Sequence, residues 1–516
     1  MAIRCQPSLA GVAKWLPVGW MALIVYVEVV QYWWVVGQCG WPRPPSLDTH
    51  AASNSVRGDS AVFRLAIVAD PQITDEYSYG LHGPLLFLNN FITDLYAKKN
   101  YRLLTGVKRP NAAVILGDMF DGGRHWTDDA WLAEYGRFQR IFRNHGQPRA
   151  SQVPKQSASA DYYNADSFFY HVVGNHDVGV GDTIIPSAIT RYQQYFGPLS
   201  YHVTLGNHTL VSLNDLALDS NNPAGDDARA FLDIFGQSQA PSPMPRLLFT
   251  HIPLYRPANT DCGPDRHRGH TINQQFGFQY QDLVRSASTQ RILDAIRPAV
   301  VFTGDDHDQC LVHHDRPASP ANAITAWVPP ASIPEYTIGS FSLAGGNTVP
   351  SFALLSLYNP LNDTAPPPPE TPTWALQLCF LPNHVAMYIM YGIMALLTLV
   401  FLAFEAWVNH DKPGLFSFVS PLGKIGYSRI HAKDYEDDLY AQRDQREPDQ
   451  ATGEAISLQV MRSPSTRSSQ RSGYSSRQDA ADGMLAPRSS SFSPSLSIDD
   501  PAFFDAASHT YPLAAP

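Results

Sequence analysis

Residues 112–124 read AAVILGDMFDGGR, a short apolar run that ends abruptly in glycine and acidic residues. Five aliphatic residues in a row are typical of a buried strand. The glycine that follows lets the backbone turn sharply and approach a ligand. This stretch therefore predicts a strand of an α/β sheet with carboxylates at its C-terminal end.

The same pattern occurs five times between residues 61 and 359. The expected strands and the polar residues after them are 63–69 with Asp70 and Gln72, 112–116 with Asp118 and Asp121, 168–173 with Asn175, His176 and Asp177, 246–250 with His251, and 299–303 with Asp305 and His307. Helical apolar spacing at 85–95 and 289–296 predicts helices on the faces of the sheet. Active sites of α/β sheets form at the C-terminal ends of strands, so we expect these side chains to converge.

The expected cluster has the chemistry of a metal centre. Aspartate, asparagine and histidine supply oxygen and nitrogen ligands that suit Mn, Fe, Zn or Mg. A single aspartate at a strand end is usually a cap or turn residue. Five such motifs together offer a bridging carboxylate and several terminal ligands, as two divalent ions require. The residues by themselves indicate metal-dependent phosphoryl hydrolysis.

Composition excludes other classes of protein. The 37 Lys and Arg against 47 Asp and Glu give a net charge of −10, so nucleic-acid binding is not expected. Five cysteines in 516 residues exclude a disulfide scaffold. Charged residues make up only 16%, against about 25% in soluble domains, which indicates apolar or Pro/Ser-rich segments.

Two apolar runs, 16–37 and 384–408, are long enough to cross a bilayer as helices. Basic residues flank both runs on the sides of the termini, which places both termini in the cytosol and the chain between the runs in the lumen or outside. We expect the first run to be an uncleaved signal anchor, with a cleaved signal peptide as the alternative. Glu28 is an unfavourable residue within it. Sequons at Asn207 and Asn362 are the expected glycosylation sites.

These features divide the chain into seven segments. They are a cytosolic N-terminus (1–15), a signal anchor (16–37), a linker (38–60), a lumenal catalytic domain (61–359), a Pro-rich spacer (360–383), a second span (384–408) and a cytosolic tail (409–516). Low hydrophobicity with many Ser, Pro and Arg residues predicts disorder in the tail. The tail is either a phosphorylated segment that binds trafficking or kinase partners, or a passive solvated one.

Cys39, Cys262 and Cys310 lie in the expected lumenal part, where oxidising conditions allow a disulfide. The sequence does not prove which of them pair. We favour Cys262 with Cys310, because both follow site motifs and their bond would pin the loop that contains Cys262.

In order and spacing, the motifs resemble the signature of the calcineurin-like binuclear metallophosphoesterases across residues 61–359. This resemblance implies an α/β fold built as a two-sheet β-sandwich flanked by helices. It also implies two metal ions that share Asp118. The first ion is expected at Asp70, Gln72, Asp118 and His307, and the second at Asp118, Asn175, His251 and Asp305. Gln72 and Asp305 stand where the family has histidine, and this harder ligand set favours Mn or Mg, with Mn the expected cofactor.

The resemblance also implies roles for the remaining residues. His176 is the expected acid for the leaving alkoxide, with Asp177 orienting its imidazole. Asp121 and Arg124 are expected to brace the loop of Asp118, although Arg124 could instead touch the substrate phosphate. The long polar loop after His251 carries three arginines that either contact substrate phosphates or lie on a plain surface excursion. They are Arg256, Arg266 and Arg268.

The strings HIPLYRP (251–257), DCGP (261–264) and FTGDDHDQC (302–310) resemble fungal phosphoesterases that remodel GPI anchors. Those membrane enzymes of the ER and Golgi remove ethanolamine phosphate from mannose. The resemblance implies a GPI lipid or GPI-anchored protein as substrate and a multi-pass ER or Golgi protein with a lumenal catalytic domain. Two alternatives stay open. One is a lumenal phosphatase with another substrate, and the other is a catalytically dead adaptor in ER–Golgi transport.

Overall fold

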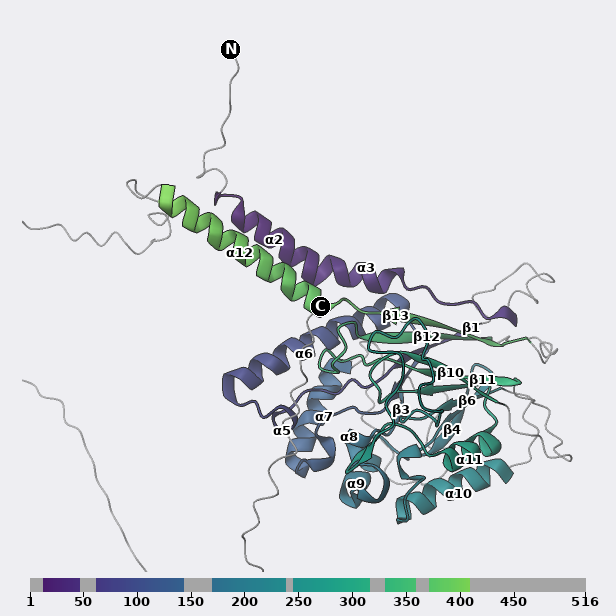
Figure 1. Cartoon of the computed structure of the whole chain (residues 1–516). Helices are drawn as coiled ribbons and strands as arrows, with labels where there is room; N and C mark the ends of the chain where they lie inside the picture. Colours follow the sequence, from purple (N-terminus) through teal and green to yellow (C-terminus); the bar gives the residue numbers. More distant parts are fainter. Residues whose placement is uncertain are drawn as a thin grey trace, which may run out of the picture. The chain divides into compact units, whose positions relative to one another are not determined.

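The computed structural model describes residues 13–46, 62–142, 169–237, 245–315, 330–358 and 371–408. Two β-sheets form the centre of the domain between the two apolar runs, and helices lie around them (Figure 1). One sheet has the strand order β13-β12-β1-β2-β3, and the other has the order β10-β11-β9-β6-β5-β4. The predicted arrangement of two sheets with flanking helices is therefore confirmed.

Parallel strands at the centre of each sheet carry the site. The first sheet consists of β1 (Val62–Val68), β2 (Ala112–Leu116), β3 (Phe169–Val172), β12 (Ser351–Tyr358) and β13 (Trp374–Phe380). The second consists of β4 (Tyr201–Leu205), β5 (His208–Ser212), β6 (Arg246–Phe249), β9 (Val300–Thr303), β10 (Cys310–Asp315) and β11 (Ser332–Thr337). Strands β1, β2 and β3 are parallel in the first sheet, as are β5, β6, β9 and β11 in the second. A small hairpin, β7 (Phe276–Gly277) with β8 (Tyr280–Gln281), lies outside both sheets.

The inner strands, such as β2 and β9, read as continuous apolar runs because both of their faces are covered. In β1, Leu65 and Ile67 belong to the core that contains Phe249 and Phe302 of the other sheet. Their neighbours Ala66 and Val68 belong to the core that contains the helices. Successive side chains of a strand point to opposite faces, so β1 separates two apolar layers.

The helices cover the outer faces of the sheets. They are α6 (Gly83–Leu103), α7 (Asp128–Phe142), α9 (Pro186–Tyr195), α10 (Pro223–Gln237) and α11 (Ser286–Ile296). The short helices α5 (Glu76–Tyr79) and α8 (Asn175–Val178) lie in the segments that follow β1 and β3. Tyr101 of α6 and Phe138 of α7 are buried in the core that contains Val68. Leu232 of α10 and Ile292 of α11 are buried in the same outer core.

Two helices in the described residues are long and apolar enough to cross a membrane. The first is continuous through α2 (Leu16–Val25), a π-helical turn (Tyr26–Val30) and α3 (Gln31–Gln38), and the second is α12 (His384–Val408). They contact each other, since Trp20 Nε1 donates to Thr398 Oγ1 at 3.1 Å and Tyr391 Oη donates to Glu28 at 2.9 Å. Glu28 also pairs with Lys99 of α6. The carboxylate expected to be unfavourable thus has two polar partners.

Two disulfides are present among the described cysteines. Cys262 pairs with Cys310, as favoured, and Cys39 pairs with Cys379. The second bond was missed because residues 360–383 were assigned to a spacer. Residues 374–380 are instead strand β13, hydrogen-bonded to β12 along its length, so the catalytic domain extends beyond the expected boundary at 359. The alternation in WALQLCF could have predicted this strand.

Of the two expected glycosylation sites, the structure describes Asn207 and does not describe Asn362. Asn207 is exposed in the turn between β4 and β5 and has a φ of 56°. Asparagine tolerates this left-handed conformation better than most residues. Asn362 and the tail from residue 409 lie outside the described residues, so the predictions about them stay predictions.

Candidate metal centre

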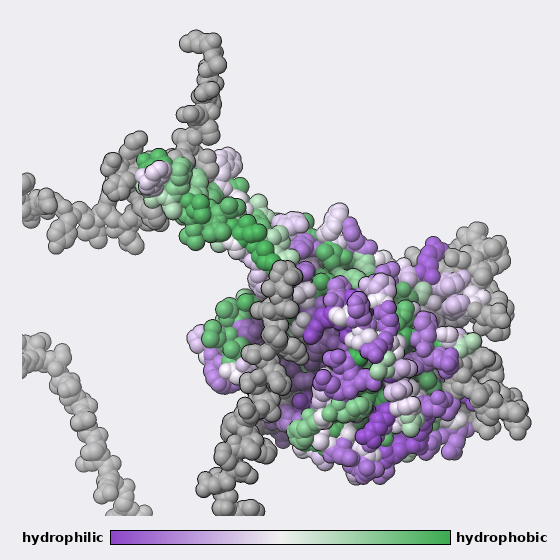
Figure 2. Space-filling model, in the orientation of Figure 1, coloured by the Kyte–Doolittle hydropathy of each residue, from purple (hydrophilic) through white to green (hydrophobic). Residues whose placement is uncertain are grey.

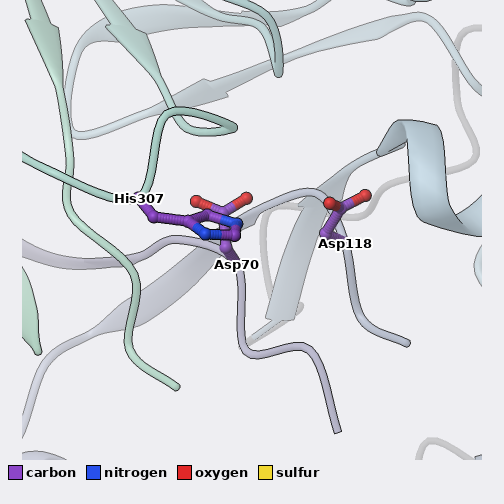
Figure 3. A group of neighbouring side chains, drawn as sticks. All are labelled: Asp70, Asp118 and His307. Atoms are coloured by element: carbon purple, nitrogen blue, oxygen red, sulfur yellow. The ribbon is translucent and has the colours of Figure 1, made fainter. Parts of the chain in front are cut away.

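Three side chains from the C-terminal ends of strands form the first group of ligands. Asp70 follows β1, Asp118 follows β2 and His307 follows β9. Each offers one ligand atom, and these atoms all lie within 4.8 Å of one another. Figure 3 shows the imidazole of His307 beside Asp70, with Asp118 on the neighbouring strand end. Both carboxylates are buried. The sequence predicted that these three residues would come together.

A second group of candidate ligands surrounds His251. Its Nε2 lies 3.1 Å from Asn175 Oδ1, 3.4 Å from Asp118 Oδ1 and 3.5 Å from Asp305 Oδ1. Asp118 therefore belongs to both groups. The sequence analysis predicted that Asp118 bridges the two metal ions, and its place in both groups agrees with that prediction.

Backbone carbonyls orient both imidazoles. His251 Nδ1 lies 2.7 Å from the Leu116 carbonyl oxygen, and His307 Nδ1 lies 3.0 Å from that of Gly345. A carbonyl only accepts, so each Nδ1 carries a hydrogen and each Nε2 is the nitrogen left to bind a cation. The oxygens around His251 Nε2 stabilise a proton on it, and a cation would displace that proton. Together with the carboxylates and the Asn175 amide oxygen, these nitrogens make a donor set that fits divalent cations.

The backbone is strained at five of the expected ligands. Residues with positive φ are Asp70 (44°), Gln72 (31°), Asp118 (51°), Asp305 (65°) and His307 (67°). Left-handed conformations in non-glycine residues cost on the order of 1–3 kcal/mol each and cluster at functional sites. The surrounding packing must hold these turns in place. Five of the ten non-glycine residues with positive φ in the described chain are thus expected ligands.

Two glycines allow the loops to approach closely. A Cβ at Gly117 would lie 2.3 Å from His251 Nδ1, and one at Gly174 would lie 2.1 Å from Asp118 Oδ1. Either contact would displace a ligand of the centre, which explains why glycine precedes both Asp118 and Asn175.

The structure exchanges the expected roles of two aspartates. His176 Nδ1 lies 2.5 Å from the carbonyl oxygen of Asp121 and 3.2 Å from its Oδ1. Asp121, and not Asp177, therefore orients the imidazole. Asp177 accepts the backbone N–H of Gly174 at 3.0 Å and holds the Asp118 loop through two further N–H groups at 3.4 Å. Neighbouring residues of a helical turn point about 100° apart, so His176 and Asp177 face different groups.

Gln72 and Arg124 both support the centre. Gln72 Nε2 donates to Asp118 Oδ2 at 3.1 Å, so the amide nitrogen and not the expected ligand oxygen faces this carboxylate. In this orientation Gln72 positions Asp118, and its predicted role as a metal ligand stays a prediction. Arg124 Nη1 donates to the carbonyl oxygen of Asn175 at 2.9 Å. This contact braces the second ligand group, whereas the sequence placed the brace on the Asp118 loop.

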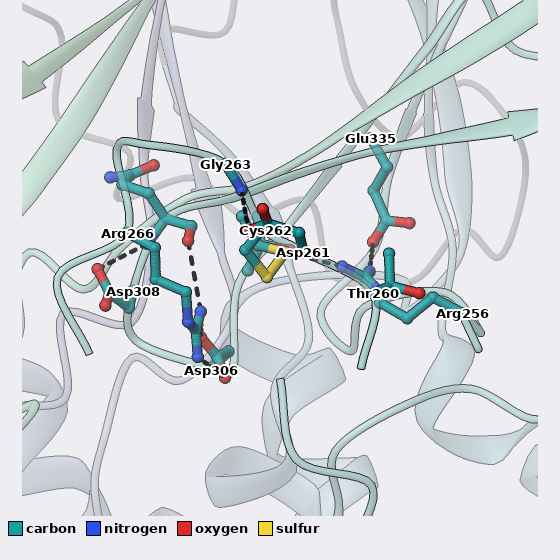
Figure 4. The surroundings of a disulfide bond; sticks show 12 residues. Arg256, Thr260, Asp261, Cys262, Gly263, Arg266, Asp306, Asp308 and Glu335 are labelled. Atoms are coloured by element: carbon teal, nitrogen blue, oxygen red, sulfur yellow. Dashed lines mark hydrogen bonds and ion pairs between the residues drawn. A yellow bond between two sulfur atoms is a disulfide. The ribbon is translucent and has the colours of Figure 1, made fainter. Parts of the chain in front are cut away.

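Two of the three loop arginines are engaged within the protein (Figure 4). Arg256 is buried, and its Nη2 lies 2.6 Å from Glu335 Oε1. Arg266 binds both carboxylate oxygens of Asp306, at 2.5 and 3.1 Å. Arg268 is exposed. The expectation of substrate contact is therefore wrong for Arg256, because the sequence could not show that a buried glutamate lies opposite.

Replacing Arg256 with methionine should lower the free energy of unfolding by roughly 3 kcal/mol, because Glu335 would keep a buried charge without its main partner. The double variant Arg256→Met/Glu335→Leu should recover most of this loss. Chemical denaturation of the purified full chain measures both effects. If Arg256→Met kept its stability but lost discrimination between substrates, Arg256 would have a substrate role after all.

The acidic centre holds protons when no metal is bound. Burial raises the pKa of Asp70 to about 8, with His251 opposing and Asp118 reinforcing the shift. Burial would also raise the pKa of Asp118, but the charges of His251 and His176 outweigh it and hold this pKa below its usual range. Burial lowers the pKa of His307 to about 4, so its imidazole is neutral and available as a ligand at neutral pH.

Metal affinity should therefore rise with pH. Below about pH 8 the Asp70 carboxyl is protonated in the metal-free protein, and a cation must displace that proton. We expect the Mn dissociation constant to fall about tenfold per pH unit per displaced proton between pH 6 and about 8. Titration calorimetry of the full chain in buffers of different ionisation enthalpy counts the released protons. An affinity that is constant across this range would contradict the assignment of Asp70.

Some supporting residues escaped the sequence analysis. Asp215 follows β5, and its carboxylate accepts the backbone N–H of His251 at 3.2 Å and of Ile252 at 2.8 Å. Burial raises its pKa to about 7. The string HTLVSLND (208–215) carries the same signal as the other strands and could have revealed it. The Gln279 carbonyl oxygen, which accepts from Asn175 Nδ2 at 3.4 Å, leaves no such signal.

The chain is similar to known phosphoesterases. Residues 63–309 match the calcineurin-like phosphoesterase family. Cell division control protein 1 of Saccharomyces cerevisiae is 33% identical over 392 residues, which cover 75% of this chain and 72% of that protein. Metallophosphoesterase 1 of Mus musculus is 26% identical over 407 residues, with coverage of 75% and 87%. A solved purple acid phosphatase from yellow lupin seeds is 12% identical, with a TM-score of 0.34 and coverage of 59% of this chain and 51% of that chain.

Proposed function

The chain belongs to the calcineurin-like phosphoesterase family, and from this premise we propose that it is a binuclear phosphodiester hydrolase acting on ethanolamine phosphate of GPI anchors. One observation carries the binuclear part of the proposal. Asp118 lies in the group with Asp70 and His307 and also 3.4 Å from His251 Nε2. A carboxylate shared by two ligand groups is what two neighbouring cations require.

The donor set supports Mn as the cofactor. Asp70, Asp118 and His307 would hold one ion, and Asp118, Asn175, His251 and Asp305 would hold the other. Carboxylate and amide oxygens outnumber imidazole nitrogens among these ligands, and such oxygens favour Mn and Mg over softer metals. When bound, two such ions supply positive charge to the phosphoryl oxygens and lower the pKa of the attacking water.

His176 is suited to protonate the leaving group. Its backbone N–H donates to Asp118 Oδ1 at 2.9 Å, which fixes the residue beside the ligands. Its Nδ1 faces Asp121, so Nε2 is the nitrogen that can donate a proton to the leaving alkoxide. The side chain is 28% exposed, which leaves room for substrate to approach.

The disulfides support the membrane topology that the sequence predicts. Cys39 directly follows α3, and Cys379 lies five residues before α12. Disulfides persist in oxidising compartments. We therefore infer that the domain between the two helices is lumenal, in the ER or Golgi, and that both termini are cytosolic. The substrate assignment itself comes from the resemblance of the loop sequences, and partners of the tail remain a prediction.

The test is turnover by the full chain in liposomes that contain Mn and a GPI glycolipid bearing ethanolamine phosphate. Mass spectrometry should show loss of ethanolamine phosphate with wild type and not with Asp118→Asn. Cleavage of a soluble aryl phosphodiester alone would keep the hydrolase and reject the substrate. Bound metal with no turnover of either compound would favour the adaptor.

A further inference from the structure

The N-terminal part of helix α6, residues 83–94, contacts the protein through polar side chains. Thr74 Oγ1 donates to Asn90 Oδ1 at 2.9 Å and lies 3.0 Å from Thr93 Oγ1. Arg137 of α7 makes two hydrogen bonds of 2.8 Å to the carboxylate of Asp94. A helix on the surface of a soluble domain normally places such residues toward water. The inner side of this part of α6 is thus held by polar contacts.

The outer side of α6 is an apolar stripe. It consists of Leu85, Phe87, Leu88, Phe91 and Leu95, whose side chains are 38% to 71% exposed. Spacings of three and four residues place them on one side of the helix, and the rings of Phe87 and Phe91 stack at 6.2 Å. Figure 2 shows hydrophobic residues gathered there, apart from the two apolar helices. Contiguous exposed apolar surface marks a binding site, whereas single residues do not.

The C-terminal half of α6 is bound to both apolar helices. Lys99 pairs with Glu28, and the rings of Tyr96 and Tyr32 lie 5.9 Å apart. Tyr96 Oη also donates to the carbonyl oxygen of Pro382 at 2.9 Å, directly before α12. In Figure 1 the N-terminal half of α6 projects on the side from which α2 and α12 leave the domain.

We propose that the apolar stripe of α6 lies in the boundary between headgroups and acyl chains of the bilayer that the two apolar helices cross. This inference rests on the membrane anchoring in the proposed function. An apolar helix face of this kind is typically buried about 5–10 Å into that boundary. Trp33 and Trp34 of α3 are exposed, and tryptophan prefers the same depth. We therefore assign the lipid surface as the partner of the stripe, because α6 is bound to the two helices that cross the bilayer.

This contact would fix the metal centre relative to the membrane. Thr74, which binds α6, lies between Gln72 and Asp75 in the loop that carries Asp70. Only α5 separates this loop from the stripe along the chain. A helix that rests on the bilayer thus holds the site at a set distance from it. The favoured substrates are phosphodiesters that stay in the membrane.

A fluorescent probe tests the position of the stripe. In the full chain with Cys5→Ser, the four cysteines of the two disulfides do not react, so Phe91→Cys can be labelled with an environment-sensitive dye. The matched control is Ile234→Cys on α10, where isoleucine is 72% exposed. In phosphatidylcholine liposomes, nitroxide-bearing lipids should quench the dye at 91 at least twofold and leave the dye at 234 unchanged. Equal, weak quenching at both positions would overturn the proposal. A shielded but unquenched dye at 91 would also do so and would indicate a protein partner or second copy.

A second experiment tests the consequence for activity. Phe87→Ser/Phe91→Ser should lower kcat/KM for a vesicle-embedded phosphodiester at least fivefold and leave a soluble aryl phosphodiester within twofold. Ile234→Ser should change neither rate. Unchanged turnover of the embedded substrate, or an equal loss for both, would overturn the positioning role. If wild type cleaved neither substrate, the hydrolase proposal would fail, and the quenching experiment would still decide the position of α6.

Discussion

Replacing Asp118 with asparagine is expected to lower kcat/KM for phosphodiester hydrolysis by about a thousandfold or more. Asp118 takes part in both ligand groups, 3.4 Å from His251 Nε2 and within 4.8 Å of the ligand atoms of Asp70 and His307. The amide has one oxygen and no charge, so it cannot serve two cations as a carboxylate does. The variant should therefore also bind fewer Mn ions than wild type.

Metal analysis and kinetics on the same preparation measure both losses. The control is Asp233→Asn, which removes an exposed ion pair with Arg291 and should leave rate and metal content unchanged. Near-ultraviolet circular dichroism shows whether the Asp118 variant keeps its packing. Wild-type metal content in a folded Asp118→Asn protein would show that this residue is not a shared ligand. A wild-type rate in the Asp118→Asn variant would rule out the binuclear mechanism.

The central strands were predictable because the sheets are covered on both faces. The run at 112–116 coincides with β2, and the other four predicted strands match β1, β3, β6 and β9 within one or two residues. Burial on both faces makes each strand a continuous apolar run, which a sequence shows directly. The polar residues after each run lie at the C-terminal ends of the parallel strands, which are on the same side of the sheet. Convergence of Asp70, Asp118 and His307 followed from this topology.

The parts that were missed depend on contacts distant in sequence. Strand β13 is at the edge of its sheet and only partly buried, so its alternating pattern is weaker than that of β2. Arg256 was assigned to substrate because nothing near it in sequence reveals Glu335. The exchange of roles between Asp121 and Asp177 follows from the direction of each side chain, which the loop geometry sets. Local sequence patterns predict helices and strands. They do not predict these side-chain contacts, which join residues that only the folded domain brings together.

Replacing His176 with asparagine is expected to slow cleavage of a diester with an alkyl leaving group by about 10²–10⁴-fold. An alkoxide is a poor leaving group unless it receives a proton as the bond to phosphorus breaks. A nitrophenolate leaves without one, so cleavage of a nitrophenyl diester should fall less than about tenfold. Asp121→Ala should give a smaller loss with the same dependence on the leaving group, since Asp121 holds His176 Nδ1.

The ratio of the two rates separates proton donation from other roles of His176. If His176 mainly stabilised the Asp118 loop through its backbone N–H, asparagine would keep that bond, and neither rate would fall. If His176 were a metal ligand, the variant would lose Mn along with activity. A selective loss with alkyl leaving groups at unchanged metal content is expected only of a proton donor. Equal losses for both leaving groups would assign the proton to another residue or to water.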